Sequence, residues 1–94
     1  RFVLCEDIAA ILGNYDAATV GILSLQQQFA SIAAAHQFQL SPSGDLAEAA
    51  QNLYRYLHRL DALNLSVILA ERMPQTGLGM SINDRLQRAA AAKP

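Results

Sequence analysis

The sequence is poor in cysteine, in net charge and in long apolar runs, and each shortage excludes a class of protein. Cys5 is the single cysteine, so no intrachain disulfide can form, and a reducing, cytoplasmic compartment is expected. Seven basic and eight acidic residues leave a net charge of −1, which gives no general field for nucleic acid or an anionic membrane. No apolar run approaches the roughly 18–20 residues that a membrane-spanning helix needs.

The sequence also lacks the motifs that most often carry catalysis or metal binding. It contains neither a phosphate-cradling GxxxxGK[ST] loop nor a dinucleotide-binding GxGxxG pattern. His36 and His58 lie in different predicted helices, far outside the spacing of paired metal ligands. No signal or transit peptide is recognisable. We therefore expect no catalytic residue and no metal site in this chain.

Residues 65–70, which read LSVILA, carry the strongest structural signal. A short apolar run with β-branched residues and polar boundaries is typical of a strand that is buried on both faces. Such a strand needs a helix over each face. The chain offers one helix directly before it, at about residues 45–63, and one directly after it, at about residues 78–92. We expect these two helices to cover opposite faces.

The remaining segments complete an α/β pattern. Strands are predicted at residues 2–4, 19–25 and 37–40, and further helices at residues 8–12 and 26–36. Strands that alternate with helices favour a three-layer sandwich with a roughly four-stranded parallel sheet. A chain of 94 residues makes a single domain, residues 1–94. Because it starts without methionine and leads straight into a strand, we expect a piece of a longer protein.

Polar residues follow the predicted strands at the edge where their carboxyl ends would meet. Glu71 ends the strand at residues 65–70, and the turn that contains Ser41, Ser43 and Gly44 follows the strand at residues 37–40. Ligands of open α/β sheets bind outside that edge. We therefore predict small-molecule binding by Ser41, Ser43, Gly44 and Glu71, with Ser24 and Glu6 nearby.

Four residues near the last two helices are predicted to have structural roles. Asp61 falls in the last turn of a predicted helix, where the helix dipole disfavours negative charge. A carboxylate there needs a partner. Arg85 and Arg88 on the last helix are the candidates, and we expect an Asp61–Arg85 pair that joins the two helices. Gly77 and Gly79 precede the last helix. They could present backbone N–H groups to an anion, but a plain helix start is favoured.

Three cationic residues lie three and four positions apart on the helix at residues 45–63. They are Arg55, His58 and Arg59, with Tyr54 and Tyr56 beside them. Such a group can contact phosphates or RNA. Because three cations are a small patch on a chain of net negative charge, a solvated helix face is favoured, and direct nucleic-acid binding is not expected.

A pattern across about residues 45–91 resembles that of a known family. It is carried by Asn52-Leu53-Tyr54, Leu57, Leu60-Asp61-Ala62-Leu63, Val67-Ile68-Leu69-Ala70-Glu71, Pro74, Gly77-Leu78-Gly79, Ile82-Asn83-Asp84-Arg85-Leu86 and Arg88-Ala89-Ala90. It looks like the C-terminal accessory domain of two-domain L-threonylcarbamoyladenylate synthases. Over residues 2–40 only the alternation of strands and helices matches. The resemblance implies a small Rossmann-like α/β fold.

The resemblance also implies a context. In that family an N-terminal YrdC-like domain makes threonylcarbamoyl-AMP from threonine, bicarbonate and ATP with magnesium, for the threonylcarbamoyladenosine modification of tRNA. An interdomain linker closes over its catalytic pocket. The resemblance implies that this nucleotidyltransferase domain and the linker lie outside the chain, so no catalytic residue carries over and no cofactor is expected here. The implied partners are the YrdC-like domain of the same protein and tRNA-modification proteins in the cytoplasm.

Two functional hypotheses follow from the sequence. The first is a non-catalytic domain that supports or regulates the catalytic domain of the synthase. The second is an independent, flavodoxin-like module that binds a small ligand such as a nucleotide at the carboxyl edge of the sheet.

Overall fold

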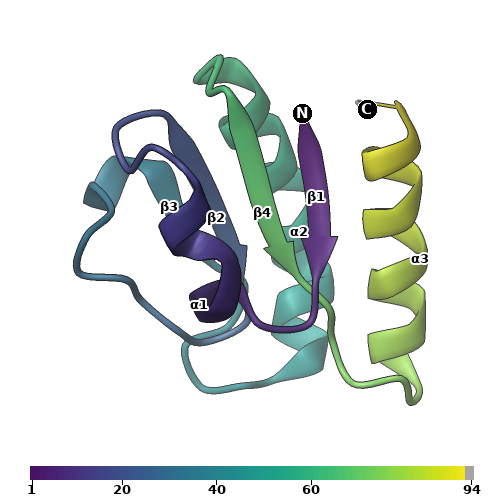
Figure 1. Ribbon diagram of the computed structural model, residues 1–94. Coiled ribbons are helices and arrows are strands. Elements are labelled where there is room, and N and C mark those ends of the chain that lie inside the picture. Colours follow the sequence, from purple (N-terminus) through teal and green to yellow (C-terminus); the bar gives the residue numbers. More distant parts are fainter. Residues whose placement is uncertain (93–94) are drawn as a thin grey trace.

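The computed structural model describes residues 1–92, and their strands form one four-stranded, all-parallel sheet (Figure 1). The strands are β1 (Phe2–Cys5), β2 (Val20–Ser24), β3 (Gln37–Gln39) and β4 (Val67–Glu71). The helices are α1 (Ile8–Ile11), α2 (Leu46–Ala62) and α3 (Leu78–Ala92), with short 3-10 turns η1 (Leu12–Asn14) and η2 (Ala34–His36). The predicted α/β class and the four parallel strands are confirmed.

The strand order is β1-β4-β2-β3, so β4 lies inside the sheet with a hydrogen-bonded neighbour on each side. It pairs with β1 from Phe2 opposite Ile68 and with β2 from Val20 opposite Val67. Residues 67–70 are all buried. The prediction of a central strand buried on both faces is therefore confirmed for residues 67–70, whereas Leu65 is half-buried and Ser66 is exposed ahead of the strand.

The placement of the helices corrects one expectation. From β1 to β2 to β3 the chain moves across the sheet in one direction, and from β3 to β4 it moves back. Right-handed crossovers place connections of opposite direction on opposite faces. Accordingly α1 and α2 cover opposite faces, and α3, which follows the last strand, packs on the same face as α2 (Figure 1). The expectation that α2 and α3 cover opposite faces of β4 is wrong, because local periodicity carries no information about strand order.

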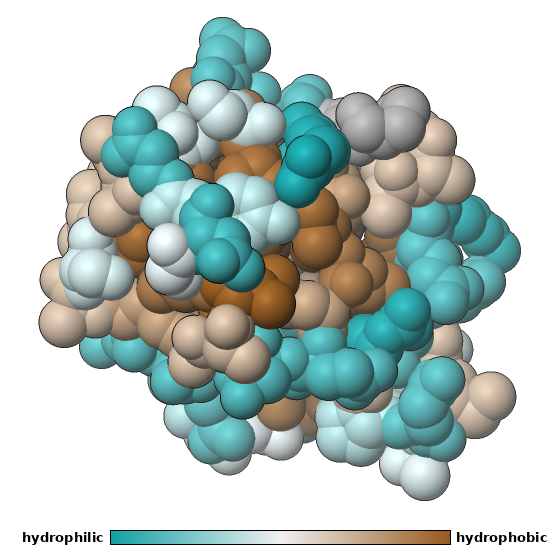
Figure 2. Space-filling model, in the orientation of Figure 1, coloured by the Kyte–Doolittle hydropathy of each residue, from teal (hydrophilic) through white to brown (hydrophobic). Residues whose placement is uncertain are grey.

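Alternate residues of each strand supply two separate cores. The first core lies under α2 and α3 and consists of Phe2, Leu23, Leu40, Ala49, Leu53, Leu60, Ile68, Ala70, Met73, Ile82 and Leu86. The second lies on the face of α1 and consists of Ile8, Val20, Ile22, Phe29, Ile32, Val67 and Leu69. In the orientation of Figure 1, apolar side chains reach the surface beside α1 over the middle of the sheet (Figure 2).

The segment at residues 26–36 is not the predicted helix. It is an irregular connection that ends in η2, although Phe29 and Ile32 are buried as the apolar spacing required. In place of helical hydrogen bonds, the Gln37 side-chain amide bonds to backbone groups of this segment. Its Oε1 accepts from Phe29 N at 2.9 Å, and its Nε2 donates to the carbonyls of Phe29 at 2.9 Å and Ile32 at 2.8 Å. An apolar pair three residues apart fits a single turn as well as a helix, and short helices are marginal without other support.

The ends of α2 follow their sequence signals. Asp45 is the N-cap, and its Oδ1 accepts from Ala47 N at 2.9 Å and from Glu48 N at 3.4 Å. Beyond the helix Asn64 has a φ of 52°, the left-handed conformation that commonly ends helices. No helix of the described residues is long and apolar enough to cross a bilayer.

Candidate functional site

The predicted ligand edge is the carboxyl edge of the sheet, and its polar groups are bonded to one another. Glu71 ends β4, and its Oε1 accepts from Leu25 N at 2.8 Å. The carbonyl of Leu25 in turn accepts from Ser41 N at 2.9 Å. The backbone N–H and C=O of Leu25, directly after β2, therefore connect the end of β4 with the turn that leads to α2.

The turn at residues 41–45 is organised around the Ser41 hydroxyl. Ser41 is fully buried, and its Oγ accepts from Asp45 N at 2.9 Å, lies 3.2 Å from the Ser43 hydroxyl and donates to the Glu48 carboxylate. Gly44 has a φ of +79°, a conformation that favours glycine. These contacts fix the start of α2.

The other predicted edge residues also have partners within the chain. Ser24 Oγ donates to Gln27 O at 2.6 Å, and Glu6 forms an ion pair with Arg72 at 3.2 Å. The structure thus brings the predicted residues to one edge, where many of their polar groups already hold the loops together. Binding of a small molecule by Ser41, Ser43, Gly44 and Glu71 stays a prediction.

Cys5 lies at the same edge, at the end of β1. Burial raises the pKa of its thiol, and the negative charges of Glu71, Asp7 and Glu6 raise it further, against a lowering by Arg72. Its Sγ donates to Ala70 O at 3.5 Å. A thiol held protonated is a poor nucleophile, and Cys5 packs as a half-buried side chain against the core on the α1 face.

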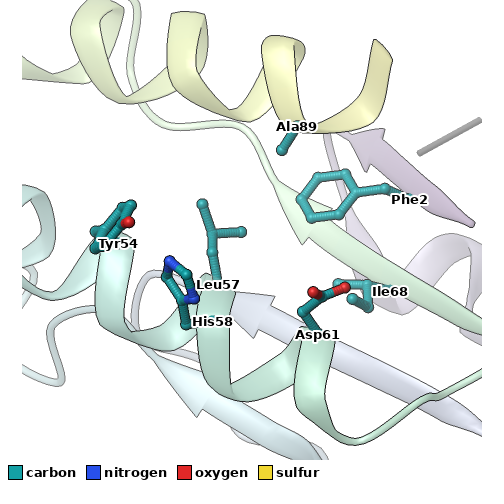
Figure 3. A pocket seen from close by; sticks show the side chains of 7 residues that line it. All are labelled: Phe2, Tyr54, Leu57, His58, Asp61, Ile68 and Ala89. Carbon is teal, nitrogen blue, oxygen red and sulfur yellow. The ribbon is translucent and has the colours of Figure 1, made fainter. Parts of the chain in front are cut away.

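A groove that the sequence reasoning missed lies toward the opposite, amino end of the strands. It runs between α2 and α3 over the start of β1 and β4, and has a volume of about 150 Å³. Figure 3 shows its lining side chains, which are Phe2, Tyr54, Leu57, His58, Asp61, Ile68 and Ala89. The sequence does indicate one wall of this groove. Tyr54, His58 and Asp61 are four and three positions apart, so their side chains share one flank of α2.

Two residues of the predicted cationic patch on α2 contact aromatic rings. Tyr54 and His58 contact each other edge to face, with ring centroids 4.3 Å apart, on the groove side. Arg55 instead lies over the Tyr56 ring at 5.0 Å, and Tyr56 stacks on Phe38 of β3 at 5.1 Å. Arg59 is exposed. Arg55, His58 and Arg59 thus share the exposed side of α2, where the His58 ring packs on Tyr54 and Arg55 lies over Tyr56.

The predicted structural residues occupy the start of α3 and the groove. An ideal Cβ on Gly79 would lie 1.8 Å from Pro74 O, and Gly77 has a φ of +51°. Asp61 lines the groove, and Arg85 is exposed on α3. The Asp61–Arg85 pair stays a prediction. Within residues 1–92 no group of three or more His, Cys, Asp or Glu could hold a metal ion.

Comparison with known proteins gives two matches. A family model described as the C-terminal domain of threonylcarbamoyl-AMP synthase matches residues 5–91. The threonylcarbamoyl-AMP synthase of Bacillus subtilis (strain 168) is 30% identical over 74 residues, which are 79% of this chain and 21% of that protein. The matched stretch therefore spans about a fifth of the length of this relative.

Proposed function

Because this chain belongs to the family of threonylcarbamoyl-AMP synthase C-terminal domains, we propose that it is a non-catalytic domain that supports or regulates the catalytic domain of such a synthase. The observation that carries the proposal is the family match over residues 5–91. Since the Bacillus relative is matched over only 21% of its length, the larger part of such a protein is available for the chemistry.

The bonding at the carboxyl edge supports a scaffold role. The Glu71 carboxylate and the Ser41 hydroxyl bind backbone N–H groups of neighbouring loops. Groups used in this way hold neighbouring loops in place, as expected of a scaffold. Cys5, with its raised thiol pKa, is unsuited to nucleophilic catalysis.

The proposal includes the cellular context. The catalytic domain would be the YrdC-like part of the same protein, a nucleotidyltransferase that uses threonine, bicarbonate and ATP with magnesium. Its product would serve threonylcarbamoyladenosine modification of tRNA in the cytoplasm, together with other tRNA-modification proteins. The present domain would hold none of these cofactors itself.

The experiment compares three proteins: the full-length synthase, the same protein without residues 1–94, and the 94-residue chain alone. Formation of threonylcarbamoyl-AMP is measured with threonine, bicarbonate and ATP. We expect no product from the 94-residue chain, and a decrease of about tenfold or more in kcat/KM on removal of the domain. Turnover by the chain alone, or unchanged kinetics without the domain, would overturn the proposal.

Titration distinguishes this function from a separate ligand-binding module. ATP, AMP and threonine are added in turn to the 94-residue chain, which lacks the catalytic domain, and NMR signals of Ser41, Gly44 and Glu71 are followed. Under the scaffold function these signals do not move. A saturable shift with a nucleotide would instead favour a ligand site at the carboxyl edge.

A further inference from the structure

We propose that the groove between α2 and α3 receives one large apolar side chain from the segment that precedes Phe2 in a synthase. This inference rests on the proposed function, because it takes the domain as the C-terminal part of a longer protein. The predicted occupant is thus a short piece of the synthase itself, adjacent in sequence to β1.

The lining of the groove determines the chemistry of the occupant. Its apolar part consists of Phe2, Leu57, Ile68 and Ala89. In Figure 3 the rings of Phe2 and Tyr54 lie at opposite ends, with Leu57 between them. A volume of about 150 Å³ matches an apolar cavity that takes up a benzene ring. The groove therefore fits one aromatic or large aliphatic side chain, in the way that a buried anchor fills a pocket at an interface.

The position of the chain start determines which segment can reach the groove. Ile68 N donates to Arg1 O at 2.8 Å, so the β1–β4 pairing extends back to Arg1. The amino group of Arg1 lies 3.2 Å from Ser66 O. Phe2 and Ile68, which both line the groove, are therefore next to the point where a preceding segment joins the domain. A few preceding residues are long enough to span the groove, since an extended chain advances roughly 3.3–3.6 Å per residue.

The exposure of Tyr54 is a further reason to expect an occupant. Its side chain is 67% exposed in this domain, although it borders an apolar groove. Tethering gives the preceding segment a high effective concentration, so that even a single anchor can remain bound. A docked segment would cover the Tyr54 ring and remove the groove from water.

The first test uses hydroxyl-radical footprinting of the full-length synthase, with labelling of each residue compared with the urea-unfolded protein. Met80, at 57% exposed and outside the groove, is the internal control. If the segment is docked about 90% of the time, Tyr54 labelling falls about tenfold below the level that its exposure predicts. Tyr54 labelling that matches that of Met80 would overturn the inference.

The second test fills the groove from within the domain. Ala89→Phe places a ring in the groove, and Ala91→Phe places the same ring on an exposed position of α3 as a matched control. In the full-length protein we expect proteolysis of the segment before Phe2 to become about tenfold faster in A89F and to stay unchanged in A91F. Equal cleavage in both variants would contradict docking. Thermal unfolding shows whether each variant folds. If A89F does not fold, the hydroxyl-radical labelling of Tyr54 in the wild-type protein alone tests the docking.

Neither test depends on catalysis, so the results can reject the proposed docking without rejecting the proposed function, and the reverse. A protected Tyr54 in a synthase whose kinetics ignore the domain would retain the docking and reject the supporting function. An exposed Tyr54 in a synthase that needs the domain would reject only the docking.

Discussion

Both faces of the sheet carry a buried apolar core, but the two covers are built in different ways. Under α2 and α3 the backbone is regular, and helical hydrogen bonds satisfy its polar groups. On the opposite face α1 has four residues, and the rest of the cover consists of 3-10 turns and the irregular segment at residues 26–36. Yet Ile32 is only 4% exposed, close to the 1% of Ile82 on the helical face. Apolar burial therefore does not require regular secondary structure, provided that side chains satisfy the backbone.

On each face a side-chain amide performs this role at a loop that contacts the core. On the helical face, Asn83 of α3 holds the loop after β4 by accepting from Met73 N at 2.7 Å and donating to Met73 O at 2.8 Å. On the irregular face, Gln37 holds Phe29 and Ile32. Asn83 is 3% exposed, whereas Gln37 is half-buried. The difference in burial decides the order of the predicted effects.

The largest effect is expected for Asn83→Leu. The change leaves the N–H and C=O of Met73 buried without partners, and each such group costs about 1–3 kcal/mol. We expect the free energy of unfolding to fall by about 3 kcal/mol in urea titrations. Gln87→Leu, at an exposed position of α3, serves as the control and should change stability by no more than about 0.5 kcal/mol. A loss below about 1 kcal/mol for N83L would contradict the role given to this amide.

A smaller effect is expected for Gln37→Leu. Water can reach part of the released backbone, so we expect a loss of about 1–2 kcal/mol and a local opening of residues 26–36. Amide exchange should become faster at Phe29, whose N–H loses its acceptor. Gln28→Leu, on the exposed side of the same segment, should leave that exchange rate unchanged. If Q37L proves as damaging as N83L, the irregular face depends on its amide as strongly as the helical face does.

The smallest effect concerns the thiol on the irregular face. Burial and then the charges of Glu71, Asp7 and Glu6 raise the Cys5 pKa. We therefore expect the rate of Cys5 alkylation by iodoacetamide to increase at a higher pH than the rate for an exposed thiol does. Because the Cys5 pKa is higher in the folded than in the unfolded protein, the protonated thiol stabilises the fold below the unfolded-state pKa. This contribution to the free energy of unfolding is lost as the pH rises through the folded-state pKa.

Glu71→Gln should shift the alkylation midpoint of Cys5 to lower pH, because it removes a charge that raises the thiol pKa. Asp84→Asn changes a carboxylate on α3 that pairs with Arg88, and it should leave the midpoint unchanged. If Cys5 of the wild-type protein shows the same pH dependence of alkylation as a free thiol, its pKa is not raised.

The sequence predicts the regular half of this molecule better than the irregular half. The run at residues 65–70 identifies β4, and the apolar stripe with Asp45 and Asn64 at its ends identifies α2. The assignment of a helix to residues 26–36 fails because Phe29 and Ile32 fit one turn, and helical spacing does not reveal the side-chain bonds from Gln37 that hold this turn. The groove escapes prediction for a similar reason. Its walls come from four separate elements that strand order and helix placement bring together.

The position of β4 has a consequence for how the domain forms during synthesis. It separates β1 from β2 in the sheet, yet it is the last of the four strands to leave the ribosome. Until residues 67–71 are available, β1 has no neighbour with which to pair, and the loop to be closed between Phe2 and Ile68 includes most of the chain. In nascent chains that stop before this strand only β2 and β3 can pair, so the sheet is completed only when nearly the whole domain has been made.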